Sequence, residues 1–272
     1  MSENILEIKN LSKYFGGLAA VSDCSLKVSR GTITGIIGPN GSGKTTLFNL
    51  IAGNLKSSGG EVFFDNENIT DVPSFELFSK GLLRTFQIAH EFSNLSVLEN
   101  LMMVPGNQSG EKLMTALLKP SLVSKEEELV KEKAKEVVDF LNLEHLSNEL
   151  AGNLSGGQKK LLELGRTMMV DAKLVLLDEV GAGVNRTLLK DLGSAIKKLN
   201  KEKGYTFCMI EHDMDFIGRL CDPVIVMAEG SVLFEGSVED AKKKNWKNRI
   251  RSNQNYEKIY KTNIFQIMEK KS

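Results

Sequence analysis

Residues 32–45 have the sequence TITGIIGPNGSGKT, in which an apolar, β-branched run leads into a glycine-rich turn and the pair Lys44 and Thr45. The apolar run, residues 32–38, predicts a strand that is buried on both faces. Residues 45–52 predict the helix that follows it. The turn matches the spacing G-x-x-x-x-G-K-[ST] in the strand–turn–helix context that supports this motif. The stretch therefore predicts a phosphate-binding loop at the end of a central strand.

The chemistry expected of this loop follows from its residue types. Glycines let backbone N–H groups point at phosphate oxygens, and the amino terminus of the helix adds a partial positive charge. We expect the Lys44 ammonium to lie on the β- and γ-phosphates of a nucleotide and the Thr45 hydroxyl to ligate Mg²⁺. The predicted nucleotide-binding residues of the loop are Gly38, Pro39, Asn40, Gly41, Ser42, Gly43, Lys44, Thr45 and Thr46.

A second predicted strand, residues 174–179 (LVLLDE), ends in two carboxylates. Ligands of open α/β sheets bind at the carboxyl ends of the strands. We expect Asp178 to hold Mg²⁺, directly or through water, and Glu179 to polarise a water molecule against the γ-phosphate. Such a strand end is weak evidence alone, and it gains its meaning from the phosphate-binding loop.

The pentapeptide LSGGQ, residues 154–158, precedes an apolar-periodic helix. Its serine is the expected helix N-cap, and its two glycines leave backbone N–H groups exposed. A simple cap would not need two glycines. The pentapeptide therefore predicts a second phosphate-recognition element, formed by Ser155, Gly156, Gly157 and Gln158.

Strand and helix signals alternate along the chain. Residues 5–9 and 24–28 alternate in polarity as edge or antiparallel strands do, and residues 74–150 show mostly helical periodicity. Further strands are expected at 61–65, 174–177, 205–210, 224–227 and 232–234. This order predicts an α/β fold with a mostly parallel sheet that a helical insertion interrupts.

The composition is that of an ordinary globular chain. Its 272 residues are 41% hydrophobic and 26% charged, which argues against a disordered chain, a fibre or a coiled coil. No apolar run approaches the roughly 20 residues that span a bilayer, and the amino terminus lacks the features of a signal peptide. The three cysteines, Cys24, Cys208 and Cys221, are expected to be reduced thiols.

The overall net charge of zero conceals a basic carboxyl-terminal segment. Residues 242–272 contain ten Lys or Arg and two Glu, a net charge of +8, which leaves −8 for residues 1–241. We expect a solvated tail or a terminal helix. Contact with anionic lipid or nucleic acid is the alternative.

The phosphate-binding loop, LSGGQ and LLDE, in this chain order, resemble the ATP-binding-cassette (ABC) ATPase family over about residues 5–240. The resemblance implies a RecA-like P-loop core with an antiparallel β subdomain. It implies an ATPase domain at residues 1–241, with a core at about 1–85 and 160–241 and a helical subdomain at about 86–159. Residues 242–272 would form an extension.

The resemblance also implies roles for residues whose local sequence alone does not indicate a function. Phe15 would stack on adenine, with Tyr14 as the weaker candidate, and Val21 would flank the nucleoside. Gln87 would contact Mg²⁺ and the attacking water, and His212 would sit at the γ-phosphate. His90 and His145 match nothing in the family and are expected to be structural.

Two positions depart from the family pattern. Val180 stands where many members have proline, and Asn185 stands where many have aspartate. We expect the first to alter the stiffness of its loop and the second to alter coupling between subunits. The catalytic glutamate is present, so the site is expected to be active.

Four shorter stretches of sequence resemble one subfamily, the ATPase subunits of bacterial branched-chain amino-acid importers. They are residues 15–21 (FGGLAAV), 84–87 (RTFQ), 95–101 (LSVLENL) and 183–185 (GVN). ATPases of urea importers and of lipopolysaccharide export are close alternatives. Residues 245–272 do not match the usual ending of the branched-chain group.

The family resemblance implies two kinds of protein partner. Each ATP would be enclosed by the loop of one subunit and the LSGGQ of a second, which predicts a head-to-tail dimer of this chain with itself or a paralogue. The segment from Ile88 to Leu101 would dock a helix of a membrane permease, unless its apolar residues Phe92, Leu95, Val97 and Leu98 fill the core of the helical subdomain. This places the chain peripherally on the cytoplasmic face of the inner membrane.

Two rival functions stay open at this point. A mechanical or nucleic-acid ATPase is favoured only by the basic tail, so no nucleic-acid partner is expected. A regulatory protein that binds ATP without hydrolysing it gains faint support from Val180 and Asn185.

Overall fold

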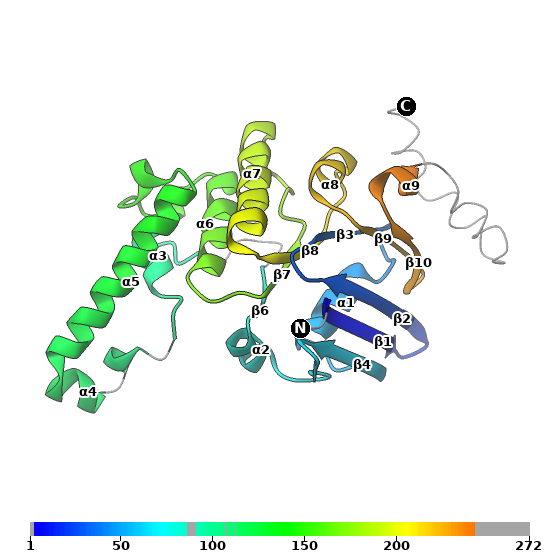
Figure 1. The fold of residues 1–272 in the computed structure, drawn as a ribbon, viewed down its shortest axis with the longest axis horizontal. Helices are drawn as coiled ribbons and strands as arrows, with labels where there is room; N and C mark the ends of the chain where they lie inside the picture. The colour runs from blue at the N-terminus through cyan, green and yellow to red at the C-terminus, as the bar shows by residue number, and fades with distance from the viewer. Residues whose placement is uncertain (1–2, 86–90, 107, 112, 243–272) are drawn as a thin grey trace. The chain divides into compact units, whose positions relative to one another are not determined.

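The computed structural model describes residues 3–85, 91–106, 108–111 and 113–242 (Figure 1). Gln87, His90 and residues 243–272, about which the sequence makes predictions, lie outside the described residues. No helix in the described ranges is long and apolar enough to cross a membrane.

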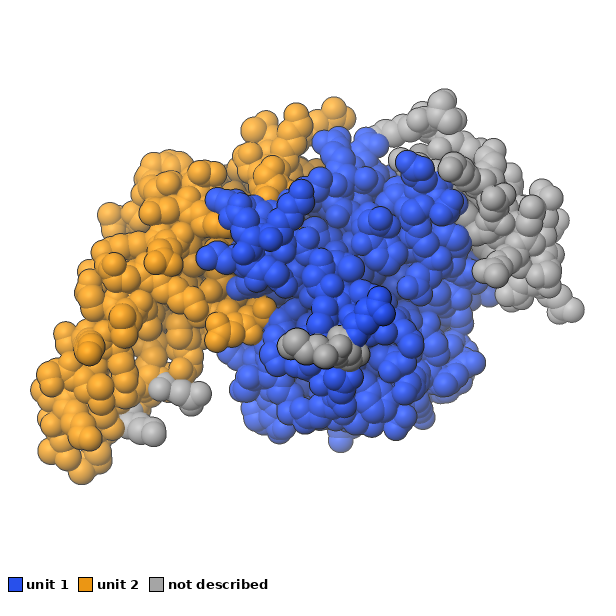
Figure 2. All heavy atoms as spheres, viewed as in Figure 1, with its two compact units in different colours: residues 1–84, 173–181, 197–272 blue, residues 85–172, 182–196 orange. Residues whose placement is uncertain are grey.

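The internal contacts of the chain divide it into two compact units (Figure 2). The first comprises Met1–Arg84, Lys173–Gly181 and Lys197–Ser272, and the second comprises Thr85–Ala172 and Ala182–Ile196. The second unit begins next to the predicted start of the helical insertion but extends beyond residue 159. The predicted domain boundaries themselves stay a prediction.

The first unit contains a four-stranded antiparallel sheet. Its strands are β1 (Asn4–Phe15), β2 (Leu18–Ser29), β4 (Gly59–Phe64) and β5 (Glu67–Asn68), in the order β2-β1-β4-β5. The predicted strands at 5–9, 24–28 and 61–65 lie within it, and the first two are antiparallel as expected. The alternating polarity along β1 and β2 suits a sheet that buries one face.

The second sheet of this unit has the order β10-β9-β3-β8-β7-β6. Its members are β3 (Ile33–Ile37), β6 (Leu82–Arg84), β7 (Leu174–Asp178), β8 (Thr206–Ile210), β9 (Val224–Ala228) and β10 (Ser231–Gly236). All are parallel except β10, which forms a hairpin with β9. Every residue of β3, β7, β8 and β9 is buried, as continuous apolar runs in a parallel sheet require.

The strand order determines which loops can form a site. Strand β8 pairs with β3 on one side and with β7 on the other, and all three run in the same direction. The segments that follow their carboxyl ends therefore begin next to one another (Figure 1). These segments contain Lys44, Glu179 and His212, and Asp178 is the last residue of β7.

Among the described residues of the first unit, four helices lie wholly within it: α1 (Lys44–Ile51), α2 (Ser74–Lys80), α8 (Met214–Leu220) and α9 (Val238–Lys242). One core cluster joins α1 to residues of both sheets, including Phe48, Phe64 and Met227. Burial of such aromatic and aliphatic side chains stabilises the helix that carries the phosphate-binding loop.

The second unit is helical. It contains α3 (Val97–Met102), α4 (Leu113–Leu118), α5 (Pro120–Phe140), α6 (Gly156–Met168), most of α7 (Arg186–Lys203) and the short 3₁₀ turns Ser109–Glu111, Glu144–Leu146 and Ala151–Asn153. The expected helices at 97–103 and 125–141 are present, and α5 begins earlier because Pro120 suits the first turn. Gly165 of α6 allows close packing, since a Cβ there would lie 2.7 Å from Leu141.

Candidate nucleotide site

The phosphate-binding loop connects β3 to α1, and two of its glycines are sterically required. A Cβ atom at Gly38 would lie 2.3 Å from the carbonyl oxygen of Met227. At Gly43, where φ is +94°, a Cβ would lie 2.3 Å from the carbonyl oxygen of Ala20. The close approach of neighbouring backbone thus dictates the loop conformation, and only glycine satisfies both positions.

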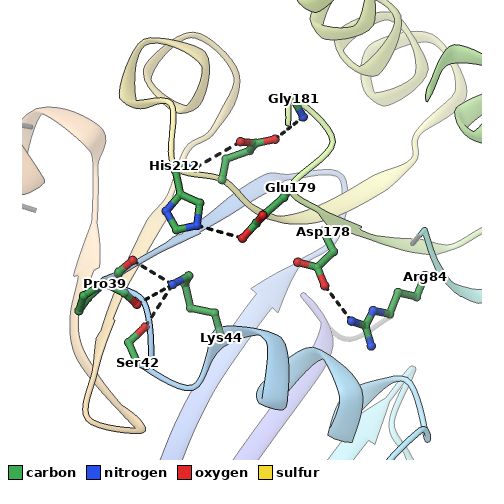
Figure 3. A network of polar contacts seen from close by, with 10 residues as sticks. Pro39, Ser42, Lys44, Arg84, Asp178, Glu179, Gly181 and His212 are labelled. Atoms are coloured by element: carbon green, nitrogen blue, oxygen red, sulfur yellow. Dashed lines mark hydrogen bonds and ion pairs between the residues drawn. The ribbon is translucent and has the colours of Figure 1, made fainter. Parts of the chain in front are cut away.

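Lys44 is buried at the first turn of α1, and its ammonium is held by the loop itself (Figure 3). Its Nζ donates to the carbonyl oxygens of Gly38 (2.9 Å) and Pro39 (2.8 Å) and to the Ser42 hydroxyl (3.3 Å). Burial lowers the pKa of Lys44, while the nearby charges of Glu179 and Asp178 oppose that shift. The ammonium is therefore positioned within the loop and faces the two acids.

The start of α1 is suited to an anion. In the described part of the chain no side chain caps this helix, and its first turn contains no acidic residue. Its first N–H groups and partial positive charge are thus available to phosphate oxygens. The remaining predicted loop residues surround this end: Asn40, Gly41 and Thr45 are exposed, Pro39, Gly43 and Thr46 are partly exposed, and Ser42 is buried.

The carboxylate of Asp178 is buried and paired with an arginine to which the sequence analysis assigned no role of its own. Arg84, the last residue of β6, donates to Asp178 at 2.7 Å and also to the side chain of Asn49. Its guanidinium lies 6.0 Å from the ring centroid of Phe48. Arg84 therefore fixes the position of the predicted metal ligand and balances its charge.

The side chains of Glu179 and His212 point toward each other (Figure 3). Nε2 of the histidine lies 2.9 Å from Oε1 of the glutamate. The imidazole is about half exposed, with 45% of its side chain accessible, against 21% for the glutamate. A carboxylate oriented in this way can accept a proton from a water molecule that approaches from the open side.

A second glutamate, Glu211, lies behind this pair and was not predicted. It is 5% exposed and accepts hydrogen bonds from the backbone N–H groups of Gly181 (2.7 Å) and His212 (3.2 Å). Burial raises the pKa of its carboxyl, and the two N–H groups oppose the shift. Its position directly after a buried strand was the only sequence signal, and it does not distinguish burial from exposure.

The two residues predicted to contact the nucleoside differ in accessibility. The Phe15 ring is 47% exposed at the end of β1, with the Lys13 ammonium 5.3 Å from its centroid, and Tyr14 is 50% exposed. Val21 is fully buried in the core cluster, so its side chain has no accessible surface on which a nucleoside could rest. Val21 is out of phase with the buried residues Cys24, Leu26 and Val28 of β2, and a register shift in the β1–β2 pairing lies between Cys24 and Val21.

The LSGGQ segment belongs to the second unit and forms the start of α6. Ser155 is the N-cap, as predicted, within a capping box in which the Gln158 side chain accepts from the Ser155 N–H at 2.8 Å. No described atom lies within 4 Å of a Cβ added at Gly156, whereas one at Gly157 would meet Leu188 at 2.5 Å. The backbone at Gly156 is thus open to a partner, and Gly157 permits close helix packing.

The apolar residues predicted to dock a permease helix lie partly at the surface and partly in the core of the second unit. Phe92 is 48% exposed and Leu95 and Leu98 are partly exposed, but Val97 is completely buried, so it fills the core of its own unit.

Asn185 accepts a hydrogen bond from the Leu188 N–H at 2.9 Å, so its side chain stabilises the first turn of α7. An aspartate could make the same bond.

The donors present suit Mg²⁺. Thr45 offers an exposed hydroxyl and Asp178 a carboxylate, which are the hard oxygen ligands that this ion binds. No group of three His, Cys, Asp or Glu side chains that could hold a metal occurs within the described ranges. A magnesium ion here would depend on phosphate oxygens for part of its coordination, as is usual in phosphoryl-transfer sites.

Comparisons with known proteins agree with this geometry. The family model described as ABC transporter matches residues 21–182. A probable branched-chain amino acid transport ATP-binding protein LivG from Archaeoglobus fulgidus is 44% identical over 236 residues, which cover 87% of this chain and 90% of that protein.

Solved structures show the same similarity. An ATP-binding cassette of an ABC transporter in its ADP conformation is 39% identical, with a TM-score of 0.76, and the match covers 95% of this chain and 99% of the other. A dimeric cassette in a post-hydrolysis state, bound to ADP and Pi, is 26% identical, with a TM-score of 0.70 and coverage of 86% and 98%.

Proposed function

The chain belongs to the ABC transporter family, and from that premise we propose that it powers the import of branched-chain amino acids through a membrane permease. It is an ABC ATPase, which couples ATP hydrolysis to transport. The single observation that best supports hydrolysis is the convergence of Lys44, Glu179 and His212 at the ends of three adjacent parallel strands. The 44% identity to a protein named for branched-chain amino acid transport supports the choice of substrate.

In the proposed reaction, Lys44 exchanges its bonds to loop carbonyls for bonds to the β- and γ-phosphates of ATP. Glu179 accepts a proton from the attacking water, and His212 keeps the carboxylate in place through their 2.9 Å contact. Gln87 contacts the same water. These residues act by positioning and by neutralising charge, so no covalent intermediate with the protein is needed.

We assign Mg²⁺ to Thr45, Asp178 and Gln87, and the bound ion would neutralise part of the phosphate charge. Adenine would stack on Phe15, whose exposed ring leaves a face open for it. Val21 would contribute only to the core beneath this surface.

The chain supplies one phosphate-binding loop and one LSGGQ, so we propose a head-to-tail dimer that encloses two ATP molecules. Ser155, Gly156, Gly157 and Gln158 of one subunit would complete the γ-phosphate site of the other, and the open backbone at Gly156 supports this. ATP would close the dimer, and loss of the γ-phosphate would release it.

The permease would dock on residues 88–101 of the second unit, where Phe92, Leu95 and Leu98 offer apolar surface. This contact would hold the chain peripherally on the cytoplasmic face of the inner membrane. The permease would then sense the nucleotide state through the cassette.

Glu179→Gln tests the catalytic assignment. The variant should bind ATP, accumulate as a closed dimer, and lose hydrolysis by about 10²-fold or more. Glu235→Gln, which alters an exposed carboxylate on β10, should keep normal turnover and serves as the control. Full turnover by Glu179→Gln would contradict the assignment of Glu179 as the catalytic base.

Reconstitution with the co-purified permease in vesicles tests the transport assignment. ATP-dependent uptake of labelled leucine is the expected result. Stimulation of ATPase activity by DNA or RNA, or transport of urea with no uptake of leucine, would reject the proposed substrate class.

A further inference from the structure

Glu211 joins two segments of the catalytic site through its two carboxylate oxygens. Oε1 accepts the N–H of Gly181, in the loop that follows Glu179, at 2.7 Å. Oε2 accepts the N–H of His212 at 3.2 Å. The carboxylate is 5% exposed, so these two bonds replace most of the hydration that it would have in water.

The loop that Glu211 holds contains a strained residue. Glu179 has a backbone φ of +50°, in the left-handed region that residues other than glycine, asparagine and aspartate rarely adopt. Such a conformation persists only where the surrounding structure imposes it, and it is frequent at catalytic positions.

Two hydrogen bonds impose this conformation, one on each side of the strained residue. The N–H of Glu179 donates to the carbonyl oxygen of Ile210 at 2.9 Å. The N–H of Gly181, two residues later, donates to the side chain of Glu211. The two acceptors belong to consecutive residues, because Ile210 is the last residue of β8 and Glu211 follows it, directly before His212.

We propose that Glu211 is a positioning residue for ATP hydrolysis: it ties the loop after Glu179 to the backbone of His212 and so holds the Glu179 carboxylate against the imidazole. This inference rests on the proposed ATPase mechanism. Glu211 does not touch the reacting atoms in this account, and it acts through the geometry of the Glu179–His212 pair.

The role requires two acceptor atoms rather than a particular side-chain size. A carboxylate offers two acceptor oxygens, whereas a carboxamide of the same shape offers one and presents its NH₂ group to the second N–H. Glu211→Gln therefore removes one of the two hydrogen bonds with little change in side-chain volume. Glu211→Asp keeps both acceptors but shortens the side chain.

The test compares kcat, KM for ATP and thermal unfolding in Glu211→Gln, Glu211→Asp and the control Glu235→Gln, all in the full chain. Glu211→Gln should lower kcat at least about tenfold and change KM less than about twofold, because positioning is lost while nucleotide contacts remain. Glu211→Asp should retain more activity than Glu211→Gln. The reverse order, or equal falls in kcat and in ATP affinity, would show that the residue only fills space.

A second measurement needs no variant. In the wild-type chain, the Gly181 amide should exchange with deuterium much more slowly than an unprotected amide, and rapid exchange would overturn the proposal. The two hypotheses fail separately. Absence of ATPase activity in the wild type defeats the proposed function, whereas an active wild type with unchanged kcat in Glu211→Gln defeats this inference alone.

Discussion

The guanidinium of Arg84 lies 2.7 Å from the carboxylate of Asp178, and only 11% and 3% of the two side chains are exposed. They come from the ends of the adjacent parallel strands β6 and β7. The pair thus balances the charge of the predicted metal ligand inside the protein, where an isolated carboxylate would be costly.

Arg84→Met should destabilise the nucleotide-free chain by about 3 kcal/mol or more, because it leaves a buried carboxylate without its partner. Urea unfolding monitored by circular dichroism measures the change. Lys80→Met is the matched control, since Lys80 pairs with Glu67 at 2.7 Å on the surface, where 60% of the acid is exposed. That variant should lose less than about 1 kcal/mol. Equal losses in the two variants would contradict the structural role of Arg84.

The phosphate-binding loop gives a second prediction. Gly43→Ala places a Cβ 2.3 Å from the Ala20 carbonyl oxygen in a backbone with φ of +94°. We expect a loss of about 2 kcal/mol or more together with loss of ATP binding, because the loop must shift. Gly59→Ala, whose added Cβ meets no described atom within 4 Å, should stay within about 0.5 kcal/mol of the wild type. Thermal unfolding and binding of a fluorescent ATP analogue measure both effects, and tight binding by Gly43→Ala would disprove the close approach.

Structural features of this protein could be predicted from the sequence where a short stretch of consecutive residues specifies them. The phosphate-binding loop, the buried strand β7 and the Ser155 cap were predicted because each is specified by a few consecutive residues. The pairing of Arg84 with Asp178 was not predicted, because these residues are 94 positions apart and β6 is only three residues long.

The accessibility of side chains was harder to predict, because burial depends on neighbours that the local sequence does not show. Val21 was expected to flank a nucleoside, and its side chain is fully buried. Val97 was expected either to contact a permease helix or to fill the core of the helical subdomain, and it is fully buried. Glu211 is the opposite case, a charged residue at a strand end that would ordinarily be solvated but is enclosed by the loop after Glu179. Local polarity indicates which elements form, and the packing of distant segments decides which side chains stay accessible.

The cysteine thiols give a prediction about pH. Burial raises the pKa of Cys24 and of Cys221 from an ordinary value of 9.0 to about 12, and it also raises that of Cys208. At pH 8 the native chain should therefore resist iodoacetamide, while the urea-unfolded chain reacts at all three positions, as a mass shift would show. Rapid alkylation of the native chain would contradict this burial.

The same shifts have a consequence for stability. A thiol whose pKa is raised on folding stabilises the folded state fully below pH 9, and this contribution is lost as the pH rises toward 12. The free energy of unfolding should thus fall between pH 9 and 11. Cys221→Ala should show a shallower fall than the wild type, and an identical slope would mean that this thiol does not contribute.

The last prediction concerns the proposed permease contact. Phe92 is 48% exposed within residues 88–101, and Arg166 lies 5.5 Å from its ring centroid. Phe92→Glu places a charge where an apolar helix would dock, so it should abolish co-purification with the permease and ATP-driven uptake. Phe75→Glu, which alters a 70% exposed phenylalanine on α2, is the matched control for adding a charge at an exposed aromatic side chain. Permease binding that survives Phe92→Glu, or that is lost equally in both variants, would exclude Phe92 from the docking surface.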